Sequence, residues 1–186
     1  MSIKIGPYYT LPNIMERVGK PNHASFKDIL TSANELYAIK NFILKHPQVT
    51  GISLPQIGIK YNCAVSRALY SSEKIQIWAN AKYIPLEGDV WETEEDCFCA
   101  GYPRRFRRSD NIRISFDCYS FANQKIESKC DTYDLKLNFA KSSQSSREAL
   151  FLVQHLIDHM NGDISKGTII NEREPLDRKK DEQENA

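Results

Sequence analysis

The sequence predicts an α+β fold in which mostly antiparallel β-sheets pack around one central, buried helix. Apolar residues repeat at helical spacing in 26–45, alternate at strand spacing between about 50 and 140, and cover most sides of a second helix at 146–160. Of the 186 residues, 41% are hydrophobic and 26% are charged, which is an ordinary balance for a globular domain. We therefore expect one domain over residues 1–170 and a charged, frayed or disordered tail at 171–186.

Charge and hydropathy argue against DNA and membranes as partners. The net charge is +1, so no overall field favours DNA. The longest apolar runs are too short to span a bilayer, and the N-terminus lacks the apolar core of a signal peptide. We expect a cytoplasmic protein with no membrane partner. In that reducing compartment the five cysteines are thiols or metal ligands, and the apolar surroundings of Cys63 and Cys118 predict core positions.

The first elements are read from turn residues and helical spacing. Prolines and a glycine in residues 1–25 predict an irregular, extended lead-in. A helix over 26–45 follows, because an apolar stripe repeats every three or four residues, and it ends before Pro47. The stripe consists of Phe26, Ile29, Leu30, Ala33, Leu36 and Tyr37.

Short strands follow, in the segments YNCAVS, KIQIWAN, NIRISFDCY and YDLKLNF. The third segment, 111–119, alternates most clearly, because isoleucine, phenylalanine and cysteine occupy every second position and polar residues occupy the positions between. One dry face and one wet face favour antiparallel pairing.

The helix at 146–160 is apolar on most sides. Ser-Ser-Arg-Glu is a candidate capping start, and Gly162 suits the C-terminal end. Leucine, valine, isoleucine and methionine side chains form one broad face, which Leu152 and Leu156 extend toward two histidines. Gln154 and Asp158 form a narrow polar strip. This pattern predicts a central helix buried in the domain.

His155 and His159 lie one helical turn apart, so both imidazoles project the same way. Two imidazoles and a thiolate make a three-ligand set that leaves one coordination position open for chemistry. Either Cys97 or Cys99, in the segment EEDCFC, is a candidate thiolate. The alternative is that the imidazoles are hydrogen-bonded in the interior without a metal.

Three separated segments resemble the signatures of the peptide deformylase family. They are TGISLPQIGI (50–59), EEDCFC (94–99) and QHLIDHMNG (154–162), and IWANAKYI (77–84) resembles the strand that precedes the second signature. The resemblance covers about residues 5–165. It implies a metal-dependent hydrolase that removes the formyl group from the N-terminal methionine of nascent proteins, with a formyl-methionyl peptide or nascent chain as its partner.

Carried over by position, the resemblance implies roles for individual residues. Cys97, His155 and His159 would be the ligands of one divalent metal ion, Fe(II) or Zn(II) first, with nickel or cobalt as alternatives. The side-chain amide of Gln56 and the backbone amide of Phe98 would stabilise the developing oxyanion. Glu95 would contact the ligands rather than the metal and would pair with an arginine of 104–108. Asp158 would orient the ligands.

The departures from the family pattern fall at positions with an implied catalytic role or next to them. Leu156 occupies the position of the glutamate that acts as general base, and general acid–base help is worth about 10²–10⁴-fold. The first signature is shorter by two residues, which displaces Gln56 unless a bulge absorbs the change. Asp96 and Cys99 replace a glycine and a serine of the second signature. Glu95 is a candidate substitute base.

Two functions therefore stay open. One is a deformylase of weak or altered activity, and the other is a catalytically inactive relative that binds metal and nascent or formylated peptides. The run Arg104–Arg108 adds a candidate ribosome or RNA contact. Ion pairing with the acidic stretch at 87–96 is the stronger interpretation of that run.

Overall fold

The computed structural model describes residues 3–10, 14–68, 71–95, 104–122, 125–127, 131–138, 144–163 and 168–169. The first half of the chain contains β1 (Ile3–Ile5), β2 (Tyr8–Thr10), α1 (Ile14–Val18), α2 (Phe26–Thr31), α3 (Ala33–Lys45), β3 (Gly51–Ser53), a 3₁₀ helix η1 (Leu54–Ile57), β4 (Cys63–Ala68) and β5 (Ser71–Pro85). The second half contains β6 (Val90–Glu95), β7 (Arg104–Ser109), β8 (Asn111–Ala122), β9 (Lys125–Ile126), β10 (Asp131–Asn138), α4 (Gln144–Asn161) and β11 (Thr168–Ile169).

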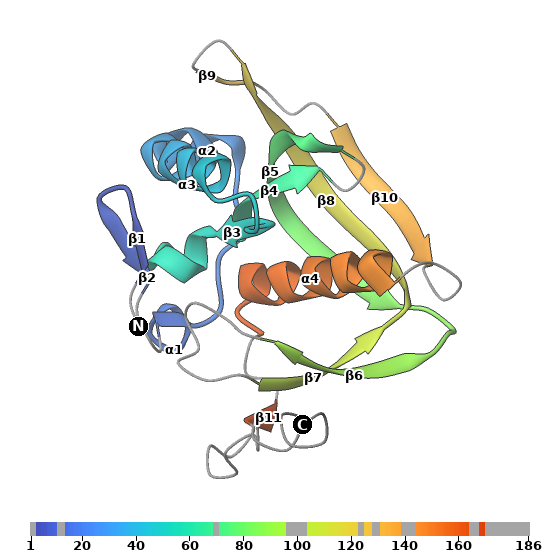
Figure 1. Ribbon diagram of the computed structural model, residues 1–186. Coiled ribbons are helices and arrows are strands. Elements are labelled where there is room, and N and C mark those ends of the chain that lie inside the picture. Colours follow the sequence, from blue (N-terminus) through green and yellow to red (C-terminus); the bar gives the residue numbers. More distant parts are fainter. Residues whose placement is uncertain are drawn as a thin grey trace, which may run out of the picture.

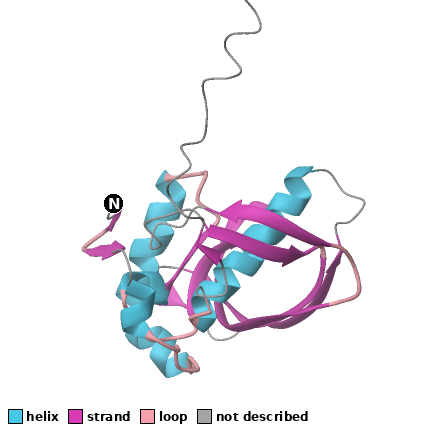
Figure 2. Cartoon of the chain, turned by 90° about the horizontal axis from the view of Figure 1, so that it is seen from below, coloured by secondary structure: helices cyan, strands magenta, loops and turns pink. Residues whose placement is uncertain are grey.

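The largest sheet carries the fold. Its strands run in the order β10-β8-β5-β4-β3, with β9 beside β8, and all of these pairs are antiparallel. Helices α2 and α3 cover one face, whereas α4 crosses the other (Figure 1). The pair β6–β7 passes below α4, so that strands lie on both sides of this helix (Figures 1 and 2). The predicted α+β fold around a central helix is confirmed.

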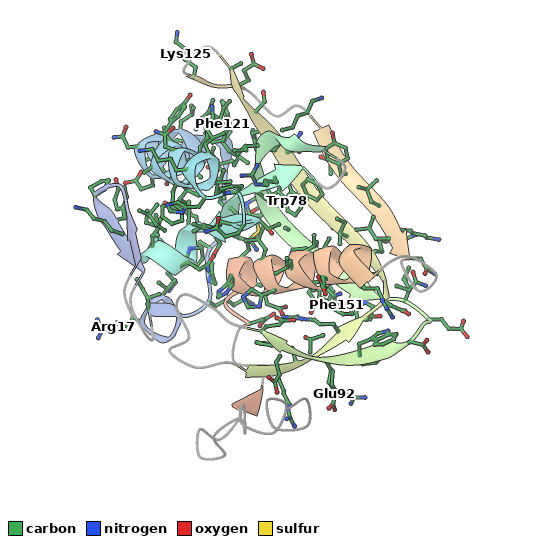
Figure 3. The ribbon with its side chains drawn as sticks, viewed as in Figure 1. Arg17, Trp78, Glu92, Phe121, Lys125 and Phe151 are labelled. Atoms are coloured by element: carbon green, nitrogen blue, oxygen red, sulfur yellow. The ribbon has the colours of Figure 1, made fainter. Side chains whose placement is uncertain are left out.

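Strand alternation explains why the sheet can be covered on both faces. Cys63, Val65 and Ile77 face the α3 side, and their neighbours Ala64 and Trp78 face α4. Trp78 lies between the sheet and α4 in Figure 3. Cys63 and Cys118 are buried, as predicted.

Helix α4 is as central as its composition predicts. Its apolar face is buried against the sheet, at Leu150, Val153, Leu156, Ile157 and Met160. The polar strip is buried as well, because Gln154 pairs with the peptide groups of Ser109: its Oε1 accepts from the Ser109 amide at 3.1 Å and its Nε2 donates to the Ser109 carbonyl at 2.8 Å. These bonds satisfy polar groups that would otherwise be costly to bury, and they attach α4 to β7.

The structure corrects several expectations in detail. The lead-in is not wholly irregular, because β1 and β2 pair around a turn with Gly6 at φ 62° and α1 follows. The predicted helix 26–45 is interrupted at Ser32. The preceding Thr31 competes for a backbone group, because its hydroxyl donates to the Lys27 carbonyl at 2.9 Å. Phe26 and Leu30 of the apolar stripe are 36% and 47% exposed.

The second face of 111–119 is not wet throughout. Tyr119 is buried on the α2 side, where the ring of Phe26 stacks on it at 5.7 Å. The serines of Ser-Ser-Arg-Glu do not precede α4, since the helix already begins at Gln144. At its other end Gly162 adopts φ 74°, as the expected C-terminal stop requires.

None of the helices in the described part of the chain combines the length and the apolar content that crossing a bilayer requires.

Candidate metal centre

The two histidines of α4 converge. Their Nε2 atoms lie 2.9 Å apart, and their rings meet edge to face with centroids at 4.7 Å. His159 is fully buried, and the His155 side chain is 13% exposed. Two nitrogen ligands of a tetrahedral zinc ion lie about 3.3 Å from one another. The spacing and direction of these nitrogens therefore suit a shared cation.

Glu95, the last residue of β6, sets the tautomer of His155. Its Oε2 lies 2.5 Å from His155 Nδ1. Because an ionised carboxylate can only accept a hydrogen bond, Nδ1 carries the hydrogen and Nε2 offers its lone pair. Burial acts to raise the pKa of Glu95, but hydrogen bonds from Arg108 and His155 outweigh it and lower this pKa to about 2. Glu95 is thus ionised at neutral pH and holds His155 in the form that a metal needs.

Arg108 holds Glu95 in turn. Its Nε and Nη2 donate to the two oxygens of Glu95 at 2.7 and 2.6 Å, and its Nη1 donates to Asp158 Oδ2 at 2.5 Å. The Arg108 side chain is only 2% exposed, and it stacks on Phe106 with 4.5 Å between the guanidinium carbon and the ring centroid. The arginine that the sequence left open within 104–108 is therefore Arg108.

Alternation along β7 explains why Arg108 is buried while its neighbour Arg107 is exposed. Phe106 and Arg108 point toward α4, whereas Arg105 and Arg107 are exposed. On β6, Glu94 and Glu92 lie opposite these two exposed arginines, and Arg105 forms an ion pair with Glu94 at 3.4 Å. The outer face of this hairpin is therefore mixed in charge, as the ion-pairing interpretation predicts; Glu92 extends away from α4 in Figure 3.

Charge balance gives a test of whether a cation fits. Two buried carboxylates, Glu95 and Asp158, share one guanidinium, that of Arg108. Together, Glu95, Asp158 and Arg108 carry a net negative charge on the Nδ1 side of His155. Buried charges are costly unless they are compensated. A divalent ion on the histidines would supply the compensating charge, so the residues present fit a metal.

Part of the predicted site lies outside the described residues. These include the expected ligand Cys97, the oxyanion donor Phe98 and the neighbours Asp96 and Cys99. Within the described ranges no three histidine, cysteine, aspartate or glutamate side chains are arranged as a complete metal site. The two histidines and Glu95 are brought together, and the third ligand stays a prediction.

Gln56 lies in η1, which packs against α4. It is buried, and its Oε1 accepts from the backbone amide of Ser53 at 2.8 Å and from the Ser53 hydroxyl at 3.2 Å. Since Ser53 engages the oxygen end, the NH₂ end is the one that points away from Ser53. That orientation suits the predicted use of Gln56 as a donor.

Leu156 lies in the apolar contact between α4 and the sheet. It is 5% exposed and belongs to the apolar cluster that also contains Ala64, Val153 and Met160. A methyl carbon of Leu156 also lies over Gly51 of β3. The position at which the sequence resemblance implies a base is therefore filled by a packed hydrocarbon side chain.

A pocket of about 580 Å³ lies between β6 and the first turns of α4, and Glu95 is part of its wall. Trp91, Phe151 and Leu152 give it apolar surface, and the guanidinium of Arg147 stacks on Trp91 at 4.5 Å. Figure 3 shows Phe151 on the side of α4 that faces β6. The exposed Leu152, which the sequence placed in the apolar zone near the histidines, was the one available signal of this pocket.

Tyr83 is a residue of this region that sequence reasoning missed. Its hydroxyl donates to Asp158 Oδ1 at 3.1 Å. Asp158 thus bonds Arg108 and Tyr83, and it is linked to His155 only through Arg108 and Glu95. No signal in the sequence placed Tyr83 beside Asp158.

Known proteins share this architecture. A peptide deformylase from Legionella pneumophila has 18% sequence identity and a TM-score of 0.56, over 91% of this chain and 87% of that one. A peptide deformylase from Plasmodium falciparum has 21% identity and a TM-score of 0.56, over 86% and 84% of the two chains. The enzyme from Synechococcus elongatus, in complex with actinonin, has 17% identity and a TM-score of 0.56, over 87% and 78%.

A comparison with curated proteins finds no match. The family described as polypeptide deformylase matches residues 10–174. This range includes all three signature segments and both histidines. The chain belongs to the polypeptide deformylase family.

Proposed function

We propose that the protein is a metal-dependent hydrolase of formyl-methionyl peptides whose turnover is weakened by Leu156. The observation that carries this proposal is the pair of convergent Nε2 atoms, 2.9 Å apart, with Glu95 bonded behind His155. The reaction consumes one water, breaks the formyl C–N bond and releases formate and the free α-amine of methionine.

His155, His159 and Cys97 are the proposed ligands. Cys97 is proposed as the third ligand because it is only two residues from Glu95, which contacts His155. A divalent ion held there would lower the pKa of a bound water and polarise a carbonyl. The Cys-His-His set accepts Fe(II), Zn(II), nickel or cobalt, because each of these ions takes borderline ligands.

The remaining groups bind and orient the substrate. The NH₂ end of Gln56 and the backbone amide of Phe98 are the proposed donors to the oxygen of the formyl group as it gains negative charge. We propose that the pocket between β6 and α4 takes the side chain of the first residue, because its wall includes Glu95 and its surface is largely apolar.

Proton transfer is the step that we expect to be slow in the proposed hydrolase. A base works best when its pKa lies near the operating pH, and the pKa of Glu95 is lowered to about 2 by Arg108 and His155 against the effect of burial. Glu95 is therefore better suited to orienting His155 than to replacing the missing base. Leu156 cannot take up a proton.

The second candidate is an inactive relative that binds metal and nascent or formylated peptides. Two observations favour it: Leu156 cannot take up a proton, and the pKa of Glu95 is too low for a base. Actinonin is bound in the Synechococcus enzyme, and we propose that this chain binds it too. The ribosome contact stays a prediction, which the salt dependence of ribosome binding by an Arg105→Ala, Arg107→Ala variant would test.

The deciding experiment uses freshly purified protein, kept anaerobic. Elemental analysis, turnover of a formyl-Met-Ala-Ser peptide and actinonin affinity are measured on the same sample, for the wild type, Cys97→Ala and the neighbouring control Cys99→Ala. One metal per chain that only Cys97→Ala loses, together with turnover, supports the hydrolase. Metal and actinonin binding without turnover supports the inactive binder. A wild-type protein that binds none of these metals contradicts both.

A further inference from the structure

The hydrogen bonds that begin at the histidines continue past Glu95 and end at Tyr83. Arg108 links Glu95 to Asp158, and Asp158 accepts from the Tyr83 hydroxyl at 3.1 Å. The side chains of Arg108 and Asp158 are only 2% and 4% exposed. Bonds in such a dry, charged series constrain one another, so the position of each member depends on the next.

A bulge in β5 brings Tyr83 to the α4 side of the sheet. Before the bulge, even-numbered residues such as Trp78 face α4. The register shifts between Ala79 and Lys82, at Asn80, which has φ 56°. After the shift, odd-numbered residues face α4, since Tyr83 lies opposite Ile114. Without the extra residue Tyr83 would point to the other face, because strand side chains alternate.

Tyr83 also stands where this network meets solvent. A pocket of about 980 Å³ at the bulge is lined by Tyr83 and Asp158 together with Asn80, Lys82 and Asn161. Burial first, and then the Asp158 carboxylate, raise the pKa of Tyr83. The hydroxyl therefore remains a hydrogen donor throughout the usual pH range, and it occupies the oxygen of Asp158 that Arg108 does not hold.

We propose that Tyr83 is a positioning residue for the histidine pair. It fixes Asp158, which sets the guanidinium of Arg108, which holds Glu95 against His155 Nδ1. Removing the hydroxyl frees Asp158 to turn toward the pocket and loosens Glu95. The population of His155 with its Nε2 lone pair aimed at His159 then falls. This inference rests on the proposed metal site for its second readout only.

The test compares Tyr83→Phe with Tyr8→Phe. Tyr8 is the matched control, because its hydroxyl donates to a carboxylate, Glu35 Oε1 at 2.8 Å, and its ring packs against the apolar cluster on the α3 side. The first readout is the ¹⁵N NMR signature of the His155 side chain in metal-free protein, which reports the Nδ1–H tautomer. The second is Zn²⁺ affinity, measured by competition with a chelator.

We expect Tyr83→Phe to shift or broaden the His155 Nδ1–H signal and to weaken Zn²⁺ binding about 3- to 10-fold, less than the 10- to 100-fold typical of groups that touch a ligand directly. Tyr8→Phe should change neither. An unchanged His155 signal in folded Tyr83→Phe overturns the inference. If the wild type binds no Zn²⁺, the proposed function fails, and the metal-free signal still decides the role of Tyr83.

A second variant guards against loss of the fold. Tyr83→3-fluorotyrosine keeps the ring and the hydroxyl but makes the O–H a stronger donor. It should shift the His155 signal and leave the unfolding midpoint unchanged. A His155 signal identical to that of the wild type in this variant overturns the inference as well.

Discussion

The side chain of Leu156 covers Gly51 so closely that a Cβ on residue 51 would come within 2.7 Å of Leu156 Cδ2. Leu156 belongs to α4, and Gly51 begins the strand that leads into Gln56. One leucine therefore occupies the position at which a base is predicted, and it packs the helix onto the segment that holds Gln56, a predicted oxyanion donor.

The first prediction concerns the missing base. Leu156→Glu should raise turnover of a formyl-methionyl peptide at least tenfold, because a positioned carboxylate contributes about 10²–10⁴-fold. It should also lower stability, since a carboxylate replaces a buried hydrocarbon. Leu156→Gln is the control, because it has a similar shape and cannot take up a proton. A flat rate in fully metal-loaded Leu156→Glu would mean that more than the base is missing.

The second prediction concerns the contact between Leu156 and Gly51. Gly51→Ala should lower the free energy of unfolding by about 1–3 kcal/mol, the usual cost of overfilling a packed site. A new Cβ would also lie 3.1 Å from the Val65 carbonyl oxygen. In a Leu156→Ala background the same change should cost less, because Cδ2 is gone. Equal costs in the two backgrounds, measured by urea denaturation, would place the strain elsewhere.

The third prediction concerns acid stability. The pKa of Glu95 falls from an ordinary 4.5 to about 2, because Arg108 and His155 outweigh burial. A carboxyl whose pKa is lowered by folding stabilises the protein above its unfolded pKa and loses this contribution as the pH falls through its folded pKa. The metal-free wild type should therefore lose about 2–3 kcal/mol between pH 5 and pH 2 that Glu95→Gln does not lose.

The neighbouring Glu94 is the control for that experiment. Its ion pair with Arg105 is more than half exposed, so it should contribute at most about 1 kcal/mol. Glu94→Gln should reproduce the wild-type pH dependence. If Glu95→Gln also reproduces the wild-type curve in chemical denaturation, the buried pair with Arg108 does not lower the pKa of Glu95.

The fourth prediction concerns the pocket beside Glu95. Leu152 is 45% exposed in its wall, so Leu152→Arg should fill it at little cost to the fold. We expect the KM for a formyl-methionyl peptide, or its Kd where turnover is slow, to rise at least fivefold. Leu44→Arg is the control, since Leu44 is 56% exposed on α3, across the sheet. Equal values for the two variants would place the substrate side chain elsewhere.

Periodic elements could be predicted from the sequence, and irregular ones could not. The helix expected at 146–160 is Gln144–Asn161, and the strand expected at 111–119 lies within Asn111–Ala122. Their spacing is a property of the chain itself. The break at Ser32 and the bulge at Asn80 depend on local hydrogen bonds and on the partner strand, which no spacing reveals.

Sequence alone determined that two imidazoles project from one side of a buried helix, because residues four apart lie one helical turn from each other. It also determined that the residue after His155 is Leu156, which cannot take up a proton. Only the tertiary structure decided that Glu95 holds His155, that Arg108 is its partner and that Tyr83 completes the series. These contacts join residues far apart in the chain. The sequence contains several arginines and tyrosines, and only the folded backbone determines which of them lie beside Glu95 and Asp158.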